Sequence, residues 1–162
     1  RSMKKSFEYI IKISETEFYD KLKKHTAFNC SSSSYDNGYE FYCDNPNNIT
    51  DLKVTPTSLL SREGILAPLI KIQTKQLDEN LKVNLTLQSN KIYYFLAVLF
   101  SLAGVLFGLI TYFNLANLCI ALIISIAFIL IINLAFFIVA KGKITDAKER
   151  FESVMIFNGH YC

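Results

Sequence analysis

Between Ile92 and Ala140, 49 consecutive residues include no Asp, Glu, Lys, Arg or His. One membrane crossing needs about 20 apolar residues at a rise of about 1.5 Å per residue, so this run is too long for one crossing and suits two. Asn114 and Asn117 bracket a short turn inside it. The run predicts a helical hairpin with helices over residues 92–113 and 117–140. A buried core helix of a soluble protein is the alternative.

Charged residues lie on both sides of this run. Residues 1–91 carry 13 Lys/Arg and 11 Asp/Glu, and residues 141–162 carry four and three. The net charge of +3 is small and dispersed, and no basic cluster is interleaved with stacking aromatics, so we expect no nucleic-acid partner. The predicted organisation is a soluble domain in residues 1–90, a transmembrane hairpin in 91–140 and a cytosolic helix and tail in 141–162.

The lysines beside the hairpin predict its orientation. Lys91 directly precedes the first helix, Lys141 and Lys143 follow the second, and the turn between the helices is uncharged. By the positive-inside rule we expect a two-pass protein of the inner (cytoplasmic) membrane with both termini cytoplasmic. The N-terminus is charged and then strand-like, so we expect no secretory signal, and Arg1-Ser2 is typical of a cloning remnant before a natural start at Met3.

The cysteines and histidines give no metal-binding pattern. The chain has no C-x-x-C, and its only histidines are His25 and His160. In a reducing cytosol Cys30 and Cys43 are expected to be free thiols, whereas an inverted topology would make them a plausible disulfide pair.

The first ninety residues predict an α+β domain. Apolar and polar residues alternate over 6–13, which predicts a strand. Ser14 and Glu17 form an S-x-x-E capping box, and Phe18 and Leu22 give the helix that follows one apolar face. This helix is expected to end near residues 25–26.

The pattern then changes to strands. We expect strands over 39–43 and 52–55, the second one at a sheet edge because Pro56 follows it. Residues 69–74 and 81–87 predict a hairpin joined through 76–80. In its second strand every other residue is apolar, which predicts antiparallel strands with one face buried under the single helix. The residues of that face are Leu81, Val83, Leu85 and Leu87.

This order of elements resembles a group of small uncharacterised bacterial membrane proteins. The resemblance rests on Phe7-Glu8-Tyr9 with the Ser14-x-x-Glu17-Phe18 helix, on residues 67–72, and on residues 81–87 leading into the membrane. It covers most of the chain as an organisation. The group has no assigned chemistry, so the resemblance implies an architecture and no mechanism.

Patterns of catalytic residues are absent from the sequence. His25 falls at a helix end, where a cation complements the helix dipole, and the glycines are isolated and form no phosphate-binding loop. The neighbouring carboxylates Glu15 and Glu17 fit the first turn of a helix better than acid–base chemistry. We therefore expect no enzyme, no catalytic residues and no cofactor.

Small side chains mark one face of the predicted hairpin. In the first helix they recur at spacings of three, four and three, and they include a G-x-x-x-G that lets another helix approach closely. The second helix repeats the small-x-x-x-small spacing. This face packs either within one hairpin or between subunits. Its residues are Ser101, Gly104, Gly108, Thr111, Ala121 and Ser125.

Asn133 is the strongly polar side chain deep in the second helix. An amide facing lipid is costly, so we expect it to face protein or water, with Ser101 at a similar depth as its partner. A structural hydrogen bond is one interpretation. The other is a ring of Asn133 side chains that lines a pore in an oligomer.

A C-terminal helix is predicted to start at Thr145 or Asp146. Its apolar face is expected to dock on the N-terminal domain, with the inner membrane surface as the alternative. Ile144, Ala147, Phe151, Val154 and Met155 make up that face.

Together these patterns predict a small membrane protein whose cytosolic domain binds a protein partner or small ligand and whose hairpin anchors it or assembles it. The expected partners are the lipid bilayer, further copies of the chain, and that unknown partner. The alternatives are an oligomeric membrane-active protein, such as a small pore, toxin or defence effector, and a membrane-bound enzyme.

Overall fold

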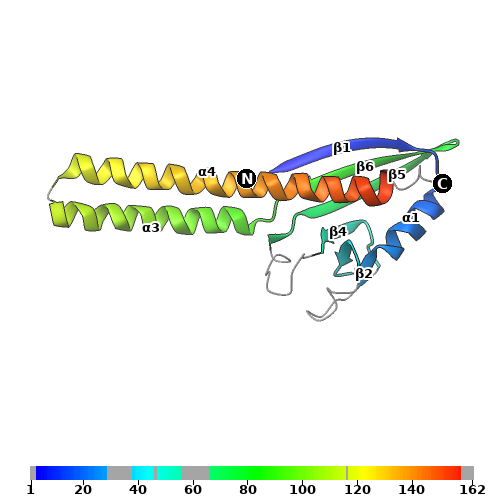
Figure 1. Ribbon diagram of the computed structural model, residues 1–162, viewed down its shortest axis with the longest axis horizontal. Coiled ribbons are helices and arrows are strands. Elements are labelled where there is room, and N and C mark those ends of the chain that lie inside the picture. Colours follow the sequence, from blue (N-terminus) through cyan, green and yellow to red (C-terminus); the bar gives the residue numbers. More distant parts are fainter. Residues whose placement is uncertain (1–2, 29–37, 46, 56–65, 116, 158–162) are drawn as a thin grey trace.

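The computed structural model describes residues 3–28, 38–45, 47–55, 66–115 and 117–157. It has the predicted α+β architecture: a sheet domain followed by two long apolar helices that project from one end of it (Figure 1). In chain order the elements are β1 (Lys4–Ile11), α1 (Glu15–Lys24), β2 (Thr26–Phe28), β3 (Phe41–Cys43), β4 (Asp51–Val54), β5 (Leu69–Leu77), β6 (Asn80–Gln88), α3 (Ile92–Leu115), α4 (Leu118–Phe151) and the π-helical turn η1 (Glu152–Ile156).

The strands form one six-stranded sheet in the order β1-β6-β5-β4-β3-β2. The neighbours are antiparallel, except that β2 and β3 are parallel, so the sheet is mixed and not purely antiparallel as predicted. The prediction that β4 is an edge strand is wrong, because β4 pairs with β3 on one side and β5 on the other. Strand β4 ends at Val54, and Pro56 lies outside the described residues.

The β5–β6 hairpin is longer than predicted. Its strands run to Leu77 and from Asn80, so the connection is only Asp78-Glu79 in place of the loop expected over 76–80. Asp78 has a φ of 47°, in the left-handed region that aspartate tolerates better than most residues. The pairing brings Ile72 opposite Leu85, and the predicted apolar face of β6 is fully buried.

Helix α1 begins as predicted. Ser14 accepts a hydrogen bond from the Glu17 backbone N–H, the Glu17 side chain accepts from the Ser14 N–H, and the helix ends at the predicted His25. These backbone and side-chain hydrogen bonds to Ser14 lower the pKa of the exposed Glu17 carboxyl. Phe18 and Leu22 are fully buried against the sheet.

The C-terminal segment does not form a separate helix. A new start at Thr145 or Asp146 was predicted, but α4 runs from Leu118 to Phe151 without a break. Thr145 donates its hydroxyl back to the Lys141 carbonyl within the helix, which is not capping geometry. No Pro and no helix-capping side chain interrupts residues 141–144, and the one glycine there adopts helical geometry, so propagation continues.

The C-terminal part of α4, together with η1, completes the core of the domain. Ile144, Ala147, Phe151, Val154 and Met155 are buried in one cluster with the inward residues of β6 and with Phe18 and Leu22 of α1. The predicted docking on the sheet domain is confirmed. Two helices, α1 and the C-terminal part of α4, therefore cover the inner face of the sheet.

Polar contacts also hold α4 to the outer strand β1. The Tyr9 hydroxyl donates to Glu152 Oε1 at 2.9 Å, and the Lys148 ammonium lies 3.0 Å from Glu152 Oε2. Lys148 also lies 5.2 Å from the centre of the Phe7 ring. Burial, followed by the hydrogen bond to Glu152, raises the pKa of Tyr9. Lys21 of α1 donates to the Met155 carbonyl at 3.3 Å, which joins the two covering helices.

The contribution of α4 to the core can be tested at Phe151, which is 0% exposed. We expect Phe151→Ala to lower the free energy of unfolding of the domain by about 3–5 kcal/mol, because the ring leaves a cavity among closely packed neighbours. Chemical denaturation in detergent, followed by far-UV circular dichroism, measures this change. Phe157→Ala is the matched control, since Phe157 is 58% exposed and its loss is expected to change the free energy by less than about 0.5 kcal/mol. Equal losses in the two variants would contradict the docking of α4.

Candidate functional site

The contact between α3 and α4 is built from the predicted small residues. Gly104 and Gly108 are buried in it, and a Cβ added to Gly108 would overlap the Ser125 hydroxyl. A Cβ added to Gly104 would lie 2.8 Å from the Phe128 ring. The Ser125 hydroxyl donates to the Gly104 carbonyl at 3.1 Å. The two helices therefore approach so closely here that only glycine fits on α3.

Asn133 is held by its own hairpin. Its side-chain amide donates to the Ser101 hydroxyl at 3.0 Å and to the Ile129 carbonyl at 2.8 Å. Ser101 in turn donates to the Ala97 carbonyl at 2.7 Å. The structure thus brings together the two polar side chains whose depths match, and joins α3 to α4 by a hydrogen bond within one chain.

The remaining residues of the predicted stripe differ in their surroundings. Ala121 is 4% exposed, and its carbonyl lies 3.3 Å from the position of a Cβ on Gly108. Thr111 is half-buried and donates to the Phe107 carbonyl of its own helix at 2.9 Å. The structure therefore brings Ala121 into the contact between the helices, whereas the hydrogen bond of Thr111 stays within α3.

Two asparagines bracket the turn of the hairpin. Asn117 caps α4 by accepting from the Ile120 N–H at 3.2 Å, and Asn114 donates to the Ile110 carbonyl at 2.9 Å. Away from their mutual contact, α3 and α4 expose large apolar side chains along their length. Both helices are long and apolar enough to cross a membrane, and the most apolar window of each is largely unburied, unlike a soluble core helix.

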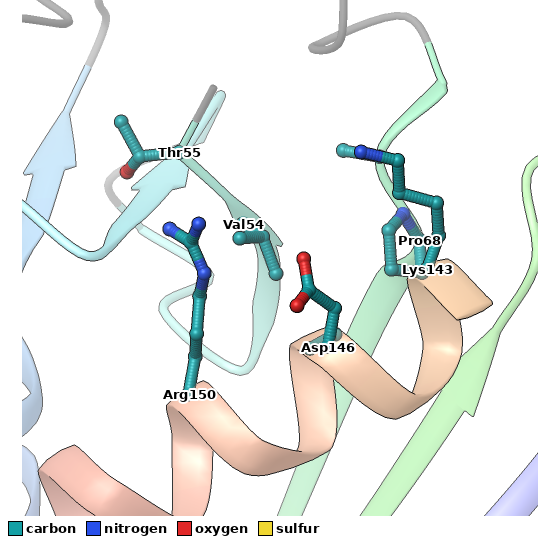
Figure 2. A pocket seen from close by; sticks show the side chains of 8 residues that line it. Val54, Thr55, Pro68, Lys143, Asp146 and Arg150 are labelled. Atoms are coloured by element: carbon teal, nitrogen blue, oxygen red, sulfur yellow. The ribbon is translucent and has the colours of Figure 1, made fainter. Parts of the chain in front are cut away.

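A small pocket lies where α4 enters the sheet domain. Figure 2 shows Lys143, Asp146 and Arg150 rising from successive turns of α4 toward the end of β4 and the start of β5. Thr55 lines this pocket, and its buried hydroxyl has no hydrogen-bond partner among the residues that the structure describes. Arg150 lies 3.8 Å from the Glu40 carboxylate. The volume is about 20 Å³, which is enough for one water molecule.

Reactive and metal-binding groups are sparse in the part of the chain that the structure describes. No group of three or more His, Cys, Asp or Glu side chains lies close enough to hold a metal there. Cys43 is a free thiol, as predicted, and it donates to the Asn45 carbonyl at 3.0 Å. Burial raises its pKa, which makes it a weaker nucleophile at neutral pH. Cys30 and His160 lie outside the described residues.

A comparison with protein-family models, curated proteins and solved structures finds no match for this chain. The resemblance to small bacterial membrane proteins therefore stays a prediction.

Several polar residues of the junction between hairpin and domain were missed by sequence reasoning. Thr55 and Arg150 come from distant segments, and Tyr9 and Glu152 are 143 residues apart. The spacing of residues along the chain does not indicate contacts between segments that are this far apart in the sequence. The heptad-like positions of Ile144 and Phe151 predicted the docked face of α4, but not which polar side chains would meet on its flanks.

The packing of α3 on α4 predicts the effect of enlarging Gly108. We expect Gly108→Leu to lower hairpin stability by about 1–3 kcal/mol, because the new side chain overlaps Ser125 while lipid solvates leucine as well as the protein does. Thermal unfolding in detergent with light scattering measures stability and oligomeric state together. Ala103→Leu, at an exposed position of α3, is the control and is expected to be neutral. A fall in oligomeric state without a loss of monomer stability would place the small residues between subunits instead.

Proposed function

We propose that this chain is a two-pass protein of the inner (cytoplasmic) membrane that presents a rigidly mounted sheet domain to a protein partner in the cytosol. The observation that carries the proposal is the continuity of α4, whose apolar segment 118–140 leads without a break into the core of the domain. A hinge between anchor and domain would need a helix break, and α4 has none. The domain therefore takes its position and orientation from the hairpin.

The proposed binding surface is the outer face of the sheet, away from α1 and α4. On β1, β5 and β6 the outward positions are exposed or half-exposed, and all are polar except Ile10, Leu69 and Leu77. They carry four lysines and one glutamate, and Glu8 pairs with Lys82 at 2.9 Å. The lysines are Lys4, Lys71, Lys75 and Lys82. Lys71 also lies 3.9 Å from Asp51 of β4. The excess of lysines over carboxylates on these three strands suits an acidic protein partner.

The lysines beside the helices support a cytosolic position of both termini, by the charge rule used above. Lys91 precedes α3, and Lys141 lies in α4 just after its apolar segment. The non-enzymatic assignment is likewise part of the proposal. It is supported by the buried, weakly nucleophilic Cys43 and by the sparse reactive groups.

The pore alternative draws less support from the contacts. A pore would need Asn133 on a shared axis, whereas its amide nitrogen is used by Ser101 and Ile129 of the same chain. The small residues that could pack subunits together are likewise used between α3 and α4.

The proposal predicts a position-specific cross-link in living cells. A photo-reactive amino acid at Gln73, an exposed outward position of β5, is expected to give a discrete adduct with an acidic protein. The same group at Lys23, exposed on α1, is the control and is expected to give none. Lys71→Glu with Lys75→Glu is expected to abolish the adduct by charge repulsion. Reporters fused before Met3 and after Cys162 are expected to read cytoplasmic.

Adducts of equal yield at Gln73 and Lys23 would contradict the assignment of the sheet face. A non-cytoplasmic signal at either terminus would contradict the topology, and a disulfide between Cys30 and Cys43 would then be the next feature to examine. A cross-link between two copies of the chain would favour self-assembly over an acidic partner.

A further inference from the structure

A groove opens where the two long helices meet the sheet domain. We call it the junction groove; it has a volume of about 250 Å³, far more than one water molecule needs. Its walls come from the start of the chain, from the β6–α3 connection, from the first turns of α3 and from the middle of α4. They include Met3, Asn90, Tyr93, Tyr94, Phe136 and Phe137.

The depth of the groove places it at a membrane boundary. On α4 it extends from Asn133 to Ala140, which is about 10 Å along the helix axis and ends where the uncharged segment ends. Four of its ten lining residues are aromatic. Tyr94 is 62% exposed and Phe137 is 55% exposed. Aromatic side chains of this kind favour the region between acyl chains and headgroups.

The wall nearest the domain is held in place by the N-terminus. The Met3 N–H donates to the Ser89 hydroxyl at 2.9 Å, and the Ser89 N–H donates to the Met3 carbonyl at 2.9 Å. Ser89 is 6% exposed, and Tyr93, one turn further along α3, is equally buried. The groove therefore has a fixed inner wall and does not depend on a mobile segment.

Three lysines directly flank residues of the groove lining in the sequence. Lys4, Lys91 and Lys141 each directly follow a residue that lines the groove, namely Met3, Asn90 and Ala140. All three side chains are exposed, and none pairs with a carboxylate among the described residues. The nearest acidic residue along α4 is Asp146, more than one helical turn beyond Lys141.

A groove at the end of the apolar segment, with four aromatic side chains in its lining and exposed lysines next to it in the sequence, matches one kind of occupant. A phospholipid has acyl chains, part of one of which can lie in the groove, and an anionic headgroup that the lysines attract. We propose that the junction groove binds one anionic phospholipid of the leaflet that faces the sheet domain. The proposal rests on the membrane crossing proposed above and not on its direction, because the groove faces a headgroup layer in either orientation.

Native mass spectrometry of the full chain in detergent tests this proposal. We expect one bound phosphatidylglycerol at lipid concentrations where phosphatidylcholine does not bind. The variant with Lys4→Gln, Lys91→Gln and Lys141→Gln is expected to weaken phosphatidylglycerol binding by about tenfold or more, since each lysine near an anionic surface contributes about fivefold. Ala97→Phe fills the groove from α3 and is expected to abolish binding with all lysines present.

Matched controls keep the test specific. Lys12→Gln, Lys23→Gln and Lys75→Gln remove the same charge from exposed positions outside the groove, and Ala103→Phe adds the same ring at an exposed position of α3. Both are expected to bind phosphatidylglycerol like the parent chain. Lys91→Glu alone, a milder change, is expected to weaken binding if the triple variant does not fold.

Equal binding of the two lipids, or equal loss in the two triple variants, would overturn the proposal in favour of general charge attraction. Displacement of the lipid by inorganic phosphate would show that the charge alone is recognised and would overturn it as well. Alkaline extraction of membranes separates this result from the proposed function: a chain released into the soluble fraction contradicts the membrane crossing, whereas a retained chain without lipid preference contradicts only the junction groove.

Discussion

The backbone hydrogen bonds of α4 continue without a break where the helix passes from its apolar segment into the sheet domain. The other features of the molecule depend on this continuity. Apolar side chains face outward along residues 118–140, and the next eleven residues turn an apolar face toward the sheet. A helix of 34 residues is about 51 Å long, of which about 35 Å is apolar and about 16 Å lies over the sheet. A helix satisfies its own backbone groups in lipid and in a protein core alike, so no special connection is needed.

The same continuity makes the sheet domain discontinuous in sequence. Phe18 and Leu22 of α1 cover part of the inner sheet face, and Phe151 and Met155 at the far end of the chain cover another part. A core of this kind closes only when the hairpin has brought α4 back to the sheet. Tyr9, Lys148 and Glu152 then hold the returning helix to the edge strand β1, which is at the opposite edge of the sheet from β2.

Short sequence patterns correctly predicted the features that depend only on neighbouring residues. The Ser14–Glu17 capping box fixes the start of α1, and the alternation from Leu81 to Leu87 fixes the buried face of β6, because both need only neighbouring residues. The parallel pairing of the three-residue strand β2 could not be read from its sequence, since three residues carry no period and the partner is chosen by tertiary contacts. The continuity of α4 was missed because a change of composition at Lys141 is not a helix-stop signal.

In the candidate site, too, some contacts could be predicted from the sequence and others follow only from the fold. Matching depths in the two helices suggested Ser101 as the partner of Asn133, because few polar groups lie at that level. The junction groove combines Met3, Tyr93 and Phe137 from three separate segments, and its walls follow only from the fold.

The most direct test of the account is the distance across the point where α4 passes from its apolar segment to the domain. Spin labels at Ile131 and Glu149, both exposed, are separated by 18 residues of α4, so a straight helix places their backbones about 27 Å apart. Pulsed electron–electron double resonance measures this distance. The chain is placed in lipid nanodiscs, and its native cysteines are replaced so that only the two chosen positions carry labels. The account predicts one narrow distribution near that value. A broad distribution or two populations would show a hinge near Lys141 and would contradict the rigid mounting of the domain.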